Sequence, residues 1–136
     1  MARIPDVQVR LRIDFISGVS LGPGKIALLE RIAAVGSLSQ AARDLGLSYR
    51  RGWVLLNDIN DAFGAPVVVT ATGGAHGGGA SLTPLGEDLI ARYRAVEQAA
   101  EASAARAFRG VGGKAAPRRG AAASIRRPLS RKAKAR

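Results

Sequence analysis

Three consecutive side chains, Tyr49, Arg50 and Arg51, offer hydrogen-bond donors directly after Ser48. An arginine guanidinium can donate two parallel hydrogen bonds, either to the edge of a guanine base or to phosphate oxygens. Ser48 is of a type that begins helices, because its hydroxyl accepts a hydrogen bond from a free backbone N–H. We therefore expect the four residues to open a helix and to contact DNA. A solvated basic surface is the simpler alternative.

Two further groups of polar side chains are candidates for the same chemistry. Ser37, Ser39 and Gln40 stand at the expected start of another helix, where they can donate to phosphate. The Ser-x-x-Gln spacing also predicts a capping box, in which each side chain satisfies the other residue's backbone N–H, and capping alone explains Ser37 and Gln40 equally well. Thr72 and His76 lie in a glycine-rich stretch and either contact a groove or phosphate or belong to a mobile loop.

The composition excludes several classes of function. The chain has no Cys and a single His, so thiolate metal sites, disulfides and a Cys or His-based triad are not expected. The run from Gly73 to Gly79 lacks the Gly-Lys-Ser/Thr that a phosphate loop requires. Apolar runs stop before the roughly 18 residues of a membrane span. We expect a cytoplasmic protein that is not an enzyme and needs no cofactor or metal.

The charge is distributed unevenly along the chain. Of a formal net charge of +11, residues 1–105 contribute nothing, since they hold 10 Lys or Arg and 10 Asp or Glu. Residues 106–136 hold the other 11 Lys or Arg and no acid, in a Gly-, Ala- and Pro-rich setting that cannot bury a core. We expect a folded domain over 1–105 and a disordered basic tail over 106–136. The tail either adds non-specific affinity for phosphate or only solubilises the chain.

The elements that must position these side chains follow from hydrophobic periodicity. Val7–Phe15 alternates apolar and polar residues, which predicts a strand with one wet face. Lys25–Val35 has helical spacing and ends at Gly36. A short capped helix then runs from Ser37 to Gly46, and a third runs from Ser48 to about Phe63. On this third helix Trp53, Leu56, Ile59 and Phe63 form a stripe that we assign to the core.

The rest of the folded region predicts a hairpin and a long helix. Val67–Thr72 is rich in β-branched residues, and Ala80–Leu82 can return beside it, with the glycines at the tip. Thr83 and Pro84 begin a fourth helix. Its apolar residues recur as a seam for a partner helix, and we assign dimerisation to Leu89, Tyr93, Val96 and Ala100.

Helix, tight glycine turn, helix and hairpin together predict a winged helix-turn-helix, an α+β fold that is mainly α. In such a fold the second helix of the pair lies in the major groove of DNA and the first crosses the backbone. Ala42, four residues before Gly46, leaves room for close packing of the two helices. The interpretation is a homodimeric, sequence-specific DNA-binding regulator. An architectural nucleoid protein and a protein-interaction module are the alternatives.

Two segments resemble a known family. They read GPGKIALLERIAAVGSLSQAARDLGLSYRRGW and ATGGAHGGGASLTPLGEDLIARYRAVE. They are similar to the N-terminal DNA-binding domain of the ModE family of bacterial molybdate-responsive regulators, which is related to the LysR-type winged helices. The similarity covers roughly Val7 to Ala100. It implies a dimeric winged helix-turn-helix that binds a palindromic operator and dimerises through its last helix.

The chain departs from that family in two places. Full-length members continue into a molybdate-binding module of small β-barrels, whereas this sequence continues into the basic tail. We therefore do not expect this chain to sense molybdate itself. Gly52 stands where such proteins usually carry Ala, at a cost of about 0.5–1 kcal/mol in a helix interior. It either allows close backbone approach or loosens the helix.

Overall fold

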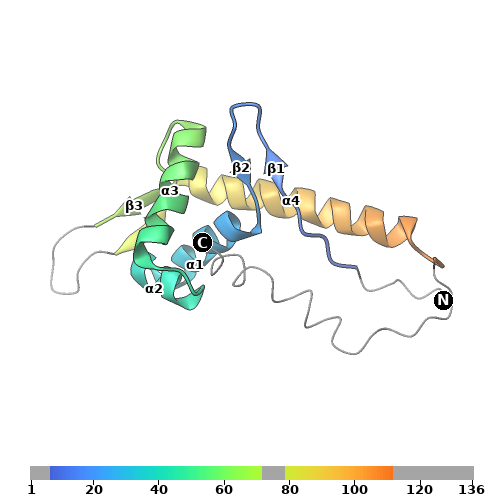
Figure 1. The fold of residues 1–136 in the computed structure, drawn as a ribbon, viewed down its shortest axis with the longest axis horizontal. Coiled ribbons are helices and arrows are strands. Elements are labelled where there is room, and N and C mark those ends of the chain that lie inside the picture. The colour runs from blue at the N-terminus through green and yellow to red at the C-terminus, as the bar shows by residue number, and fades with distance from the viewer. Residues whose placement is uncertain (1–6, 72–78, 112–136) are drawn as a thin grey trace.

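Four helices and two small antiparallel hairpins make up the fold, in a computed structural model that describes residues 7–71 and 79–111 (Figure 1). The predicted α+β class, mainly helical, is confirmed. In chain order the elements are β1 (Ile13–Asp14), β2 (Ser20–Leu21), α1 (Pro23–Val35), α2 (Leu38–Asp44), α3 (Tyr49–Phe63), β3 (Val68–Thr70), β4 (Ala80–Leu82) and α4 (Pro84–Ala107).

Hydroxyl side chains begin three of the helices where the sequence predicts them. Ser37 Oγ accepts from the N–H of Gln40, and Ser48 Oγ accepts from the N–H of Arg51, each at 3.0 Å. Thr83 Oγ1 does the same for Gly86 at 3.1 Å. The reciprocal half of the capping box is wrong, because the Gln40 amide bonds to other side chains of α2. Each cap satisfies an N–H that the first helical turn leaves free.

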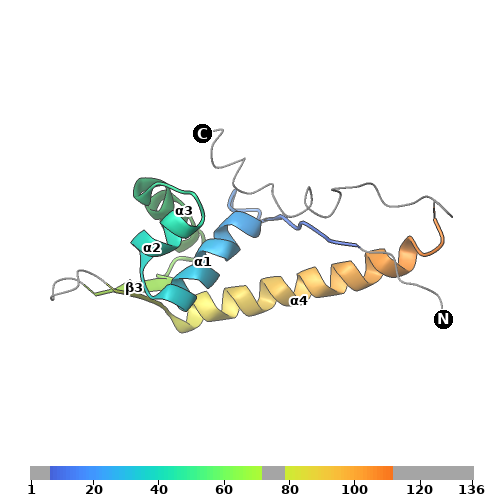
Figure 2. The same ribbon diagram turned by 90° about the horizontal axis from the view of Figure 1, so that it is seen from below.

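The long N-terminal strand is the main error of the sequence prediction. Only Ile13 and Asp14 pair with a neighbouring strand, β2, which the sequence analysis did not identify. Residues 7–12, the N-terminal arm, run beside α4 instead (Figure 2). The alternation is real, since every second residue of the arm is half-buried. A two-residue period shows that one face is covered, but it does not show whether a strand or a helix covers it.

Two apolar clusters form the core. The larger joins α1, α2, α3, the β3–β4 hairpin and the start of α4, with Leu56 and Ile59 of α3 at its centre. Trp53 and Phe63 pack against its edge, so the predicted stripe is confirmed. The smaller cluster consists of Leu21, Ile26 and Tyr93, and the N-terminal arm packs against it.

The core buries part of the predicted dimerisation seam on α4 and leaves another part exposed. Leu89 is 7% exposed and Tyr93 is 1% exposed, so neither offers a partner any surface. The Tyr93 hydroxyl donates to the backbone oxygen of Leu11 at 2.5 Å, which ties the arm to α4. The arm therefore covers Tyr93, whereas the larger core cluster buries Leu89. Val96 remains 47% exposed.

The end of α4 extends beyond the predicted domain boundary. The helix continues through Arg106 to Ala107 and is followed by turns as far as Val111, whereas the predicted folded domain ends at Ala105. The remainder of the predicted tail, residues 112–136, lies outside the described residues.

We expect Tyr93→Phe to make stability less dependent on alkaline pH. Burial raises the pKa of Tyr93, and the Glu97 carboxylate raises it further. Because the folded-state pKa exceeds that of an unfolded tyrosine, about 10, this contribution to stability is present below that value and is lost as the pH rises through the folded-state pKa.

Urea unfolding at about pH 8 and about pH 11 measures the effect. Between about pH 8 and about pH 11 the free energy of unfolding should fall more in wild type than in the variant. At the lower pH the variant should be less stable than wild type by about 1 kcal/mol, because it lacks the hydrogen bond. Equal losses in the two proteins would show that ionisation of the Tyr93 hydroxyl does not cause the loss of stability at alkaline pH.

Candidate nucleic-acid interface

The α2–α3 corner positions the predicted contact residues. Gly46 lies between the helices at a φ of 72°, and the N–H of Leu47 donates to the carbonyl of Ala42 at 2.8 Å. Gly52 on α3 is buried against α2, where an added Cβ would lie 3.3 Å from both Ala42 Cβ and Leu38 Cδ1. Of the two alternatives for Gly52, close approach is correct. The missing side chain lets α3 pack directly on α2.

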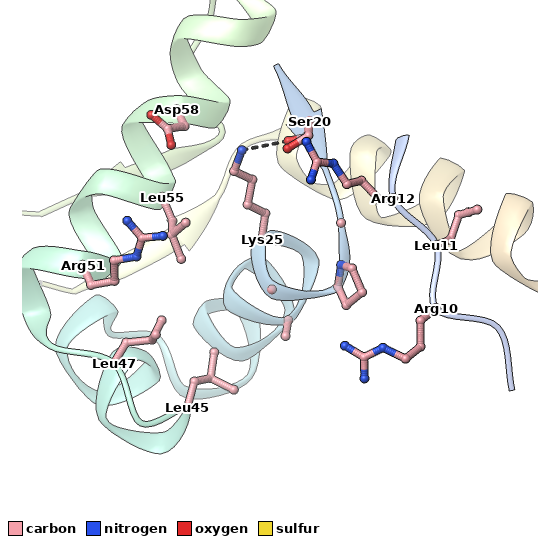
Figure 3. Close-up of a pocket in the computed structure, with 14 residues that line it drawn as sticks. Arg10, Leu11, Arg12, Ser20, Lys25, Leu45, Leu47, Arg51, Leu55 and Asp58 are labelled. Atoms are coloured by element: carbon pink, nitrogen blue, oxygen red, sulfur yellow. Dashed lines mark hydrogen bonds between the residues drawn. The ribbon is translucent and has the colours of Figure 1, made fainter. Parts of the chain in front are cut away.

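The first turn of α3 presents part of the predicted triplet to solvent. Tyr49 is 54% exposed, with its ring edge-on to Trp53 at 6.2 Å between centroids, and Arg50 is exposed. Arg51 differs, because it is only partly exposed and lines a hollow on the flank of the helix (Figure 3). Tyr49 and Arg50 therefore stay available at the tip of α3, and Arg51 faces the N-terminal arm.

Two exposed residues of α3 were not identified from the sequence. Val54 is 41% exposed and Asn57 is exposed, four and seven positions after Arg50. Residues at these spacings share one face of a helix. We call Arg50, Val54 and Asn57 the outer face of α3. The signal was present in the sequence, since the stripe of Leu56 and Ile59 already fixes which face must be opposite.

The α2 candidates are held in different ways. Ser39 is exposed, and the Ser37 hydroxyl is occupied as a cap acceptor. The Gln40 amide is used within α2: its Nε2 donates to Asp44 Oδ1 at 2.7 Å, and its Oε1 accepts from Arg43 at 3.1 Å. It would have to leave these partners to reach a phosphate.

Asp44 closes this network. Its carboxylate accepts from Arg31 Nε at 2.8 Å, and this hydrogen bond, followed by the one from Gln40, lowers the pKa of Asp44. The carboxylate therefore stays ionised to a lower pH than a free aspartate side chain does. The Nε of Arg31 is thus paired with a carboxylate of α2.

The hairpin of β3 and β4 is fixed to the same corner. Asn60 on α3 accepts from the N–H of Val67 at 2.9 Å, and the N–H of Ala80 donates to the carbonyl of Gly36 at 2.9 Å. Gly86 lies so close to the residue before β3 that an added Cβ would stand 2.3 Å from the Val67 oxygen. The base of the hairpin thus has one position relative to α3. Thr72 and His76 belong to the stretch between the strands that lies outside the described residues.

Within the described residues, no group of three or more His, Cys, Asp or Glu side chains could hold a metal ion. In the same part of the chain, no helix is long and apolar enough to cross a membrane.

Comparison with known proteins gives the sequence relationship. The chain is 49% identical over 81 residues to the molybdenum-pterin-binding protein MopB of Rhodobacter capsulatus, covering 60% of this chain and 30% of MopB. It is 39% identical over 88 residues to the molybdenum transport protein ModE of Azotobacter vinelandii, covering 65% and 33%. It is 45% identical over 76 residues to the DNA-binding transcriptional dual regulator ModE of Escherichia coli K12, covering 56% and 29%.

The chain is a sequence relative of ModE. This confirms the resemblance inferred from the two segments, whereas the link to LysR-type helices stays a prediction. The chain spans only about 30% of the length of the relatives it matches. The names of these relatives denote a molybdenum-pterin-binding protein, a molybdenum transport protein and a transcriptional regulator, and none of the three names denotes an enzyme, which agrees with the prediction that the chain is not an enzyme. No protein-family model matches the chain.

We expect Gly52→Val to lower the free energy of unfolding by about 1–3 kcal/mol, because the new methyl groups overpack the α2–α3 contact. Gly24→Val is the matched control, since nothing lies within 4 Å of a Cβ added at this α1 position. It should change stability by less than about 1 kcal/mol. Urea unfolding of both variants measures the difference. If both variants were equally stable, the contact at Gly52 would not be tight.

Proposed function

We propose that this chain binds double-stranded DNA as a homodimer and regulates transcription, with α2, the Gly46 turn and α3 acting as a helix-turn-helix. The observation that carries the proposal is the exposed, Ser48-capped first turn of α3, which is held at a fixed angle by the glycine contact with α2. The name of the Escherichia coli relative, a DNA-binding transcriptional dual regulator, supports the same reading for the matched segment.

In this proposal the N-terminal half of α3 enters the major groove. Arg50 donates to guanine, Asn57 pairs with adenine, and Val54 packs on a thymine methyl group, which are the pairings that these side chains favour. Asp58 and Asp61 on the later turns are exposed and would repel phosphates. They limit how far the helix can lie along the groove.

The remaining candidates contact the backbone or the neighbouring groove. Ser48 and Tyr49 lie at the start of α3, and Ser37 and Ser39 lie at the start of α2, where N–H groups and hydroxyls suit phosphate oxygens. The β3–β4 hairpin acts as the wing, and Thr72 and His76 in its intervening stretch reach an adjacent groove.

Dimerisation is assigned to the second half of α4. The helix contains 24 residues, a length of roughly 36 Å, and only its first half carries residues of the two core clusters. Val96 and Phe108 are exposed apolar side chains, at 47% and 59%, and Ala100 is half-buried. The proposed dimer seam therefore consists of Val96, Ala100 and Phe108. Leu89 and Tyr93 are no longer part of it. A two-fold dimer would present two α3 helices to a palindromic site.

The basic tail supplies general affinity in this account. Its cations carry no sequence information, so they favour any duplex, and they would hold the protein on the nucleoid in the cytoplasm. Molybdate sensing is not included in the role of this chain. Architectural coating of DNA is the second candidate, favoured by the 11 cations after residue 105. Discrete peaks of genome occupancy indicate a regulator, and a broad footprint indicates an architectural protein.

We expect Arg50→Ala to reduce preference for a selected site over scrambled DNA by about 1–3 kcal/mol, because it removes a base contact. Arg51→Ala is the matched control: the same change one residue away, on the flank, should weaken binding to both sequences equally. Fluorescence anisotropy with the two duplexes measures both ratios. A preference that is unchanged in Arg50→Ala would remove this side chain from base recognition.

Deleting residues 112–136 removes nine of the chain's 21 Lys and Arg residues and leaves α4 intact. We expect the dependence of log affinity on log salt to become shallower while preference for the selected site is kept. Titrations at four salt concentrations test this expectation. If preference disappears with the tail, the division between a specific domain and a non-specific tail is wrong.

A further inference from the structure

An open hollow of about 470 Å³ lies between the N-terminal arm and α3. Arg10 and Arg12 line it from the arm, Arg51 lines it from α3, and Lys25 rises between them from the start of α1 (Figure 3). Leucines from the α2–α3 turn and from α3 form part of its wall. The hollow therefore joins three segments that are far apart in the sequence.

The charges around this hollow are strongly unequal. Four cationic side chains line it, against the single carboxylate of Asp58. Lys25 Nζ donates to the carbonyl of Ser20 at 2.8 Å, and Arg12 pairs with Asp14 at 2.7 Å. Among the described residues, Arg10 and Arg51 have no ion pair and no side-chain hydrogen bond. A hollow lined by one sign of charge concentrates ions of the opposite sign.

The start of α1 adds to this field. The helix begins beside the hollow with Gly22 as its N-cap, and no side chain accepts from the first turn. Free N–H groups at a helix start carry partial positive charge. The four cations remain the main feature, and the helix end reinforces them.

We propose that this hollow seats phosphates of the DNA backbone next to the groove that receives α3. The inference rests on the proposed function, because it takes its ligand from the same duplex. Arg51 lies in the same first turn of α3 as Arg50 but on its flank, so the hollow borders the proposed interface. It is also open to solvent, as a site for a continuous strand must be.

In this arrangement the N-terminal arm has a role that the helix-turn-helix does not supply. Arg10 and Arg12 hold the backbone on the side of α3 that faces the arm, opposite Arg51. Phosphate contacts fix the register of a protein on a duplex and do not specify bases. The hydrogen bond from Tyr93 to Leu11 then acts as an anchor that keeps both arginines in place.

The test compares the full chain with the double variant Arg10→Ala/Arg12→Ala on one preferred and one scrambled duplex. Losing two phosphate contacts should lower the slope of log affinity against log salt by about 2, on both duplexes. Arg92→Ala is the control, because this exposed cation of α4 is not part of the hollow. It should leave the slope at its wild-type value. An unchanged slope in the double variant, or an equal fall in the control, overturns the proposal.

A second arm separates the duplex from free anions. At matched ionic strength, inorganic phosphate should not raise the melting temperature of wild type by more than it raises that of the double variant. A phosphate-dependent rise that the double variant loses, with no change in its DNA slope, would assign the hollow to a free oxyanion instead. The failure of the proposed function is distinct from both outcomes, since it appears as wild type binding the two duplexes equally.

Discussion

The approach of α3 to α2 at Gly52 is the constraint on which the other features of the interface depend. Because no Cβ stands between the helices, Ala42 and Leu38 contact the α3 backbone directly. This contact sets which residues of α3 point inward and which form its outer face. Asn60, in the last turn of the same helix, accepts from the N–H of Val67 and so fixes the residue that leads into β3. Moving α3 would therefore displace the base of the hairpin as well.

Most of the helical framework could be predicted from the sequence, because it is determined by local signals. Ser and Thr cap helices when they directly precede a segment with helical periodicity, as Ser37, Ser48 and Thr83 do, and Gly46 marks the turn. The stripe of Leu56 and Ile59 gave the inner face of α3 for the same reason. These signals require no knowledge of distant parts of the chain.

The errors concern contacts between distant segments. The alternating N-terminal residues pack on α4, about 80–90 positions away, and a period of two cannot identify that partner. The same contact helps to bury Tyr93 and so removes one residue of the predicted seam, while the larger core cluster buries Leu89. Arg51 was grouped with Tyr49 and Arg50 by adjacency, yet consecutive helix residues point about 100° apart. The hollow could not be foreseen, since it depends on the position of the arm.

The central claim is that α3 carries specific recognition and that the tail adds only general affinity. Amide chemical shifts of the full chain, recorded with and without a duplex of its selected site, test it most directly. The account predicts the largest changes at Ser48–Asn57, with smaller ones at the start of α2 and in the N-terminal arm. Changes confined to residues 112–136, with α3 unaffected, would contradict it.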